Sequence, residues 1–304
     1  MSVLEVKDVT KTFGKFTALD GVNFNIGSGE VFGFIGPNGS GKSTTIRIIL
    51  GILKATGGDV SVFGKDAWHD AVEIHKRLAY VPGDVNLWPN LTGGEVIDLF
   101  SKLRGSTTTS RREELIRKFD LDPTKKCRTY SKGNRQKVAL IAAFSSDADL
   151  YILDEPTSGL DPLMERVFQE CVMDVKSKGK SVLLSSHILS EVEKLCDRVG
   201  IIRQGKIIET GSLTELRHLT RTHMLVETKQ PISSLHELQG VHEIEETEQG
   251  LTFQVDTEEL DATIRHISQF GIEKLESAPP TLEDLFLRHY ERKEKSERKL
   301  GGVR

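Results

Sequence analysis

The chain has 304 residues, of which 37% are hydrophobic and 28% are charged. This composition excludes a disordered or fibrous protein, and at roughly 150 residues per domain the length predicts two domains. The 41 Lys and Arg residues against 45 Asp and Glu residues give a net charge of −4, which excludes a general electrostatic attraction to nucleic acid.

Apolar stretches are short throughout the sequence. The longest uninterrupted one, residues 138–144, is far below the roughly 18 residues that a membrane-spanning helix needs. Charged residues at positions 5, 7 and 8 interrupt any N-terminal signal sequence. The three cysteines form no C-x-x-C pair, which favours neither a disulfide framework nor a zinc ribbon. We therefore expect a soluble protein of the reducing cytoplasm.

The first thirty residues predict a small antiparallel β layer. Apolar and polar residues alternate over residues 3–9 and 22–26 with the period of two that is typical of strands. Glycines separate these runs where tight turns are expected. They are Gly14, Gly21, Gly27 and Gly29.

From residue 31 the sequence alternates apolar strands with helical segments, which predicts a mainly parallel sheet wrapped by helices. Residues 84–145 show helical patterns and no strand pattern, so we expect a helical insertion there. Residues 201–209 predict a hairpin with Gln204 and Gly205 at its turn. The expected strands are residues 31–36, 78–82, 150–154 and 181–187, and the expected helices are 44–50, 95–103, 111–119, 135–144 and 188–197.

A second pattern begins after residue 220. Residues 221–290 predict a small α+β domain, and residues 291–304 form a run of mixed charge, for which a solvated tail is favoured over a membrane-surface patch. Residues 1–220 would form the larger domain. In the small domain, strands are expected at residues 223–228, 241–246, 251–256 and 272–277, and helices at 261–270 and 282–290.

Residues 36–43 read GPNGSGKS and match the phosphate-binding pattern G-x-x-x-x-G-K-[ST], between a predicted strand and a predicted helix. Glycine lets several backbone N–H groups converge on a phosphate chain, and the helix dipole adds positive potential there. Lys42 would neutralise the β and γ phosphates, and Ser43 would bind Mg²⁺. The predicted nucleotide contacts in this stretch are Gly36, Pro37, Asn38, Gly39, Ser40, Gly41, Lys42, Ser43 and Thr44.

The apolar strand at residues 150–153 is followed directly by Asp154 and Glu155. This places two carboxylates at the carboxyl edge of the sheet, where open α/β folds bind ligands. With a phosphate loop upstream, Asp154 is predicted to hold Mg²⁺ and Glu155 to orient the attacking water of a phosphoryl transfer. Without that loop, a strand ending in a polar turn would explain the pair equally well.

Three further sequence motifs indicate which family of phosphate-binding proteins the chain resembles. Residues 130–134 read YSKGN and resemble the LSGGQ signature of ATP-binding cassette (ABC) proteins, while residues 158–161 (SGLD) and 185–187 (SSH) resemble their D-loop and switch histidine. Alone, these strings would indicate a Ser-capped helix start and an ordinary loop histidine. Together with the two preceding motifs, over residues 1–220, they identify the chain as similar to the nucleotide-binding subunit of an ABC transporter.

This resemblance implies an α/β P-loop cassette with an antiparallel β subdomain and a helical insertion. It also implies a homodimer or pseudo-dimer in which each of two MgATP molecules lies between the phosphate loop of one chain and Ser131, Gly133 and Asn134 of the other. Asp161 would belong to this interface, and His187 would contact the γ phosphate.

Phe13 matches the aromatic residue of the family that stacks on adenine. The alternatives are that Phe13 is a core residue of the β layer or that Phe16 has this role.

The sequence departs from the family after the strand at residues 78–82. The usual Gln, which helps to position Mg²⁺ and water, is replaced by Gly83 followed by Asp84. We hypothesise that Asp84 supplies a carboxylate near the metal, the alternative being that it only caps the next turn. Tyr130, Lys132 and Asn134 also differ from the signature, whereas Ser131 and Gly133 match it.

Residues 280–287 (PTLEDLFL) resemble the C-terminal motif of drug and antibiotic exporters. The resemblance implies an ATPase that drives export through a separate transmembrane permease, docked near residues 86–100, on the inner face of the cell membrane. Two alternatives remain. One is an ATP-gated dimerisation module with little turnover, and the other is a soluble cassette ATPase acting on DNA or ribosomes, against which the single phosphate loop and the net charge argue.

Overall fold

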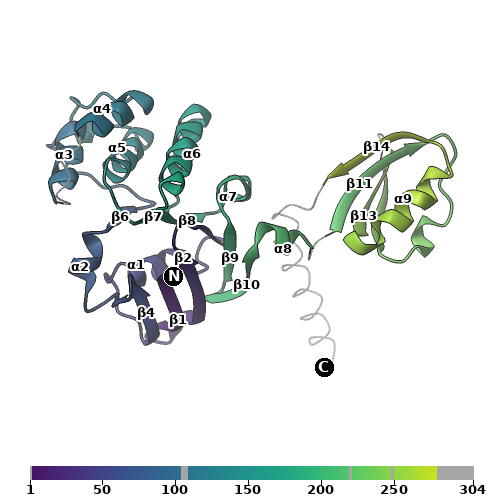
Figure 1. The fold of residues 1–304 in the computed structure, drawn as a ribbon, viewed down its shortest axis with the longest axis horizontal. Coiled ribbons are helices and arrows are strands. Elements are labelled where there is room, and N and C mark those ends of the chain that lie inside the picture. The colour runs from purple at the N-terminus through teal and green to yellow at the C-terminus, as the bar shows by residue number, and fades with distance from the viewer. Residues whose placement is uncertain (1, 104–108, 219–220, 248–249, 279–304) are drawn as a thin grey trace. The chain divides into compact units, whose positions relative to one another are not determined.

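The computed structural model describes residues 2–103, 109–218, 221–247 and 250–278, which are drawn in colour in Figure 1. The chain divides into two compact units, residues 1–210 and 211–304. This division precedes the boundary expected at residue 220. None of the helices in the described ranges combines the length and the apolar character that crossing a bilayer requires.

A four-stranded sheet in the order β2-β1-β4-β5 forms one layer of the first unit. The first two strands pair antiparallel through a turn at Gly14, whose φ of 58° suits glycine. Alternate residues are buried over residues 4–6 and 22–26, as the period of two predicts. The alternation breaks between Val6 and Val9, where the pairing register of the two strands shifts. The strands are β1 (Ser2–Phe13), β2 (Phe16–Gly27), β4 (Gly57–Val62) and β5 (Lys65–Asp66).

A six-stranded sheet in the order β10-β9-β3-β8-β7-β6 forms the centre of the first unit. The five strands from β9 to β6 pair in parallel. Every residue of β3, β7 and β8 is buried, because both faces of a parallel sheet are covered. The strands are β3 (Val31–Ile35), β6 (Leu78–Val81), β7 (Leu150–Asp154), β8 (Ser181–Ser186), β9 (Arg198–Arg203) and β10 (Lys206–Ser212).

The strands of this sheet are joined by helices, as Figure 1 shows. The exception is the expected hairpin between β9 and β10, where Gln204 and Gly205 have φ angles of 49° and 76°, the left-handed pair of a tight hairpin turn. Outside the helical insertion, the connecting helices of the first unit are α1 (Lys42–Ile49), α2 (Ala71–His75), α6 (Pro162–Ser177) and α7 (Leu189–Leu195). Helix α8 (Leu213–His218) follows β10 and belongs to the second unit.

A helical insertion separates β6 from β7. It contains α3 (Gly93–Leu103), α4 (Thr109–Lys118), the short 3₁₀ helix η1 (Cys127–Thr129) and α5 (Lys132–Phe144). Within its described residues there is no strand, only an isolated bridge between Thr92 and Lys126.

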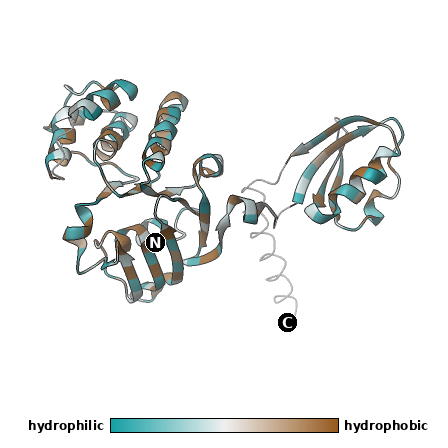
Figure 2. Cartoon of the chain, in the orientation of Figure 1, coloured by the Kyte–Doolittle hydropathy of each residue, from teal (hydrophilic) through white to brown (hydrophobic). Residues whose placement is uncertain are grey.

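The second unit is a four-stranded antiparallel sheet in the order β12-β13-β11-β14. Helix α9 contributes Ile267 to a separate core that includes Met224 and Phe253, and apolar residues recur along its strands (Figure 2). The helix expected at residues 282–290 and the tail at 291–304 lie outside the described residues. The elements are β11 (Arg221–Thr228), η2 (Leu235–Glu237), β12 (Val241–Thr247), β13 (Gly250–Asp256), η3 (Thr257–Glu259), α9 (Leu260–Ser268) and β14 (Ile272–Ala278).

Candidate functional site: a phosphate loop beside a carboxylate pair

The loop between β3 and α1 requires glycine at specific positions. A Cβ on Gly36 would lie 2.2 Å from the backbone oxygen of Ile202, and one on Gly41 would lie 2.6 Å from Leu19 Cδ2. Gly41 also has a φ of 115°, which L side chains rarely adopt. The chain can therefore wrap tightly around the N-terminus of α1 only with these two glycines, and the first backbone N–H groups of the helix are left facing outward.

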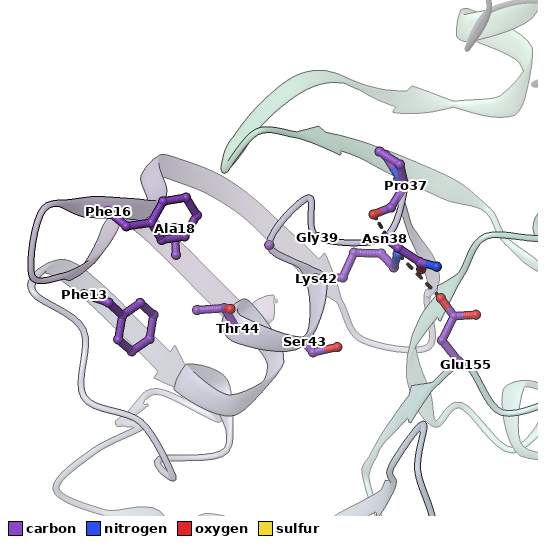
Figure 3. Close-up of a pocket in the computed structure, with 11 residues that line it drawn as sticks. Phe13, Phe16, Ala18, Pro37, Asn38, Gly39, Lys42, Ser43, Thr44 and Glu155 are labelled. Carbon is purple, nitrogen blue, oxygen red and sulfur yellow. Dashed lines mark hydrogen bonds and ion pairs between the residues drawn. The ribbon is translucent and has the colours of Figure 1, made fainter.

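This loop borders a cavity of about 410 Å³, which Figure 3 shows with its lining side chains. Gly36 and Ser40 do not line this cavity, and they lie close together, because a Cβ on Gly36 would meet Ser40 Oγ at 2.7 Å. The other predicted contacts of the loop line the cavity. The lining residues are Phe13, Phe16, Ala18, Pro37, Asn38, Gly39, Gly41, Lys42, Ser43, Thr44 and Glu155.

Lys42 supplies a buried cation at this cavity. Its side chain is 6% exposed, and its Nζ donates to the carbonyl oxygens of Gly36 at 2.6 Å and Pro37 at 3.3 Å. The same Nζ lies 3.5 Å from Glu155 Oε1 (Figure 3). A cation held mainly by neutral carbonyl groups retains net positive charge to offer to an anion.

Glu155 joins the cavity to the loop that follows β8. It has a φ of 48°, a left-handed conformation that costs a non-glycine residue about 1 kcal/mol or more. Its N–H donates to the carbonyl oxygen of Ser185 at 2.8 Å, which holds this turn against the neighbouring strand. Its second carboxylate oxygen contacts Nδ1 of His187, whose side chain is 58% exposed. Glu155 and His187, each of which the sequence predicts to be catalytic, therefore contact each other.

Asp154 ends β7 and is 5% exposed. Burial raises the pKa of its carboxyl above the usual range, and the hydroxyl groups of Ser185 and Ser43 oppose this shift. Within the described structure its Oδ1 has no hydrogen-bond partner. A buried carboxylate oxygen without a donor, close to a serine hydroxyl, is suited to a hard cation such as Mg²⁺, which binds few protein ligands directly. The residues present therefore fit the predicted metal.

Gly83 lies against the backbone of this carboxylate pair. A Cβ at this position would be 3.3 Å from the carbonyl oxygen of Asp154 and 3.5 Å from Glu155 Cβ. Asp84, the next residue, is exposed, and its Oδ2 accepts a 3.5 Å hydrogen bond from Asn86. Across the described ranges, no hydrogen bond or ion pair joins Asp84 to Asp154 or Glu155.

Phe13 and Phe16 face each other across the β1–β2 turn and both line the cavity, at the end away from Glu155 (Figure 3). Phe13 is 49% exposed and Phe16 is 65% exposed. Neither is a core residue, so both offer a ring face near the phosphate loop.

The N-terminus of α5 is built by the predicted signature residues. Ser131 caps the helix, its Oγ accepting from the Asn134 N–H at 3.2 Å. Gly133 abuts the loop after β7, where an added Cβ would lie 2.4 Å from the backbone oxygen of Gly159. Asp161 caps α6 by accepting from the N–H groups of its first turn. The signature and D-loop strings therefore pack together within one chain.

The unusual residues of the signature have structural partners. Tyr130 is buried and donates from its hydroxyl to the carbonyl oxygen of Asp122 at 2.5 Å. Lys132 donates to Ser158 Oγ at 2.7 Å. These substitutions therefore anchor the N-terminus of α5 to the insertion and to the D-loop.

Two buried polar residues near the site carry no sequence pattern that would single them out. Gln136 on α5 donates to the carbonyl oxygen of Pro156 at 2.9 Å, and Glu191 on α7 accepts from Ser186 at 2.8 Å. Both side chains are buried. The hydrophobic pattern of a helix does not show that a polar residue on it is buried.

Two family models match parts of this chain. A family model described as ABC transporter matches residues 19–158, and a model described as ATP-binding protein DrrA1-3-like, C-terminal domain, matches residues 211–290. The chain is 33% identical over 293 residues to the uncharacterized ABC transporter ATP-binding protein YhaQ of Bacillus subtilis, over 94% of this chain and 97% of that protein.

Two further known proteins each match about two thirds of this chain. The bacitracin transport ATP-binding protein BcrA of Bacillus licheniformis is 35% identical over 211 residues, which cover 68% of this chain and 69% of BcrA. The dimeric structure of a post-hydrolysis state of the ATP-binding cassette MJ0796, bound to ADP and Pi, has a TM-score of 0.63 at 26% identity and covers 69% of this chain and 98% of that chain. With its phosphate loop and carboxylate pair in place, the chain belongs to the ABC transporter ATP-binding proteins and is an ATPase.

Proposed function

We propose that this protein is the ATP-hydrolysing subunit of a membrane exporter, which pairs around two MgATP molecules and drives transport through a separate permease. The observation that carries the proposal is the contact of one carboxylate, Glu155, with both Lys42 and His187 beside the phosphate loop. The second unit, with its DrrA-like match, and the transport functions named for BcrA support an exporter.

Each group at the cavity has a distinct part in this proposal. The backbone N–H groups of the loop and Lys42 hold the phosphates, because several donors and one cation converge there. Glu155 orients the attacking water, and His187 contacts the γ phosphate from the opposite loop. Phe13 stacks on adenine, with Phe16 beside it as the alternative.

Ser43 and Asp154 would hold Mg²⁺. When bound, the metal supplies charge stabilisation for the oxygens of the transferred phosphoryl group. Asp84 is proposed as an additional carboxylate near the metal. If this is correct, the Asp84→Ala variant needs more Mg²⁺ than the wild type for half-maximal ATPase activity, and unchanged metal dependence and turnover would refute it.

The pairing of two copies follows from the N-terminus of α5. Ser131, Gly133 and Asn134 form the start of α5, where Ser131 Oγ accepts from the Asn134 N–H and the N–H groups before it have no partner within the helix. Such a helix start is suited to an anion and is distinct from the loop at α1. We assign these residues, with Asp161 nearby, to the ATP of a second subunit. Hydrolysis then removes a γ phosphate that both chains bind, so the interface weakens and the permease can change state.

The exporter proposal places the subunit in the cytoplasm, on the inner face of the cell membrane. Its partner is a hydrophobic permease on a separate polypeptide, and no nucleic acid takes part. Purifying the subunit from membranes and identifying the polypeptide that accompanies it tests this assignment. Recovery with ribosomes or DNA in place of a membrane protein would contradict it.

The central test of catalysis is the Glu155→Gln variant. We expect steady-state ATPase activity to fall by about 100-fold or more while ATP binding is retained, because the amide keeps the shape of the side chain but lacks its charge. Glu170→Gln, at an exposed position of α6, is the matched control and should leave turnover unchanged. Equal activity of the two variants would contradict the role of Glu155.

A further inference from the structure

A buried carboxyl lies behind the loop that carries His187. Glu191 is in the first turn of α7 and is only 4% exposed. Its Oε2 accepts a hydrogen bond from Ser186 Oγ at 2.8 Å, and among the described residues its Oε1 has no hydrogen-bond partner. Burying a carboxyl with half of its acceptors unused is unfavourable for folding, which indicates a role other than stability.

Ser186 connects this carboxyl to His187. Its Oγ donates to Glu191 and also accepts from the N–H of Ile188 at 3.0 Å. Because a hydroxyl has a single proton, the bond to Glu191 fixes its orientation and leaves a lone pair for Ile188. The two bonds flank His187 in the sequence, so they hold its backbone from both sides while its Nδ1 contacts Glu155.

Helix α7 is itself fixed to the central sheet. Val192, next to Glu191, is fully buried, and a Cβ on Gly33 of β3 would lie 2.6 Å from Val192 Cγ1. This close approach joins α7 to the strand that leads into the phosphate loop. The hydroxyl of Thr157, two residues after Glu155, also favours the ionised form of the Glu191 carboxyl. Glu191 is therefore held in place by the packing of α7, and it interacts with both the end of β8 and the loop that follows β7.

We propose that Glu191 is a positioning residue for ATP hydrolysis, which holds the loop of His187 through Ser186 so that His187 stays in contact with Glu155. The inference rests on the proposed role of His187 at the γ phosphate. In the described structure Glu191 does not line the cavity, and its hydrogen bond goes to Ser186, so it acts through His187.

Four single variants test this role in the full-length protein, with MgATP as the substrate and His187→Ala as the reference. Glu191→Leu removes the acceptor at similar volume, and Glu191→Gln keeps a carbonyl acceptor for Ser186. Ser186→Ala removes the hydroxyl link and leaves Glu191 in place. Ser181→Ala is the matched control, because Ser181 is a buried serine at the other end of β8 with its own bonds to Gly27 and Gly29.

We expect Glu191→Leu and Ser186→Ala to lower kcat by about tenfold or more with less than a threefold change in KM, because misplacing a catalytic group affects the transition state more than binding. Glu191→Gln and Ser181→Ala should stay within about threefold of wild-type kcat. Adding Glu191→Leu to His187→Ala should cause no further loss, which a general effect on folding would not reproduce. If Glu191→Leu fails to fold, Ser186→Ala and Glu191→Gln decide the question.

Wild-type kcat in Ser186→Ala, or an equal loss of kcat in Glu191→Gln and Glu191→Leu, would overturn the inference. An additive loss of kcat when Glu191→Leu is combined with His187→Ala would also overturn the inference. If His187→Ala retains wild-type kcat, the proposed role of His187 fails and this inference fails with it. If His187→Ala is impaired while Glu191→Leu is not, only this inference fails.

Discussion

Asp154 and Glu155 are adjacent in sequence but occupy different environments. Asp154 is almost fully buried at the end of β7, and burial raises the pKa of its carboxyl. Glu155 follows in a left-handed turn with 21% of its side chain exposed, between the Lys42 ammonium and the His187 ring. The turn therefore separates a carboxyl suited to holding a metal from one that substrate water can reach.

The buried carboxyl of Glu191 makes stability depend on pH. Burial raises its pKa from 4.5 to about 7, with Glu165 and Glu155 adding to this shift and the hydroxyls of Ser186 and Thr157 opposing it. The folded protein thus keeps a proton between pH 4.5 and 7 that the unfolded chain loses. This contribution to stability is complete below pH 4.5 and is lost as the pH rises through 7.

Glu191→Gln has no such titration. We therefore expect its free energy of unfolding, relative to that of the wild type, to increase by up to about 3 kcal/mol between pH 4.5 and 7.5. Denaturant unfolding of both proteins across this range measures the difference. Parallel pH profiles would show that Glu191 is ionised throughout.

At the scale of elements, the central strands and the phosphate loop could be predicted from sequence. The centres of strands β3, β7 and β8 are apolar because both of their faces are buried, and β7 and β8 end in polar residues at one edge of the sheet. The packing of Gly133 on Gly159 could not be predicted, because it joins loops distant in sequence. Glu191 resembles an ordinary polar residue of an amphipathic helix until α7 is placed against β3.

The N-terminus of α5 packs tightly against the loop after β7, so a side chain added at this contact should disturb the site. In Gly133→Ala, the new Cβ would meet the backbone oxygen of Gly159 at 2.4 Å, so one of the two elements must shift. We expect ATPase activity to fall by about tenfold or more while ATP binding to the single subunit is unchanged.

Gly57→Ala provides the control for this prediction. Its Cβ would lie in ordinary contact, 4.0 Å from Thr10 Cβ, at a backbone conformation open to alanine. Activity should therefore stay near that of the wild type. Weakened ATP binding in Gly133→Ala, or equal activity of the two variants, would contradict the assignment of Gly133 to the site of a partner subunit.

At the scale of the whole molecule, each of the two units buries apolar residues of its own. Among the described residues, one core cluster of the first unit lies between Leu4 and Ile202, and a cluster of the second lies between Met224 and Ile267. The match to YhaQ covers 94% of the chain, so both units occur together in a relative. Each unit is expected to unfold in its own transition.

MgATP should stabilise only the first of these units. At a concentration 100 times its dissociation constant, a ligand adds about 2.7 kcal/mol to the stability of the unit that binds it. We expect calorimetry to show one transition shifted upward by MgATP and one unchanged, with the shift lost in Lys42→Ala. A shift of both transitions, or of neither, would contradict a nucleotide site confined to the first unit.

The proposal that each ATP lies between two subunits is tested most directly by mixing two inactive variants. Lys42→Ala removes the cation of the phosphate loop, and Ser131→Arg blocks the N-terminus of α5. A mixed pair has one site with both defects and one site with none. We expect the mixture to regain ATPase activity that neither variant has alone, whereas a mixture as inactive as its components would contradict the shared site.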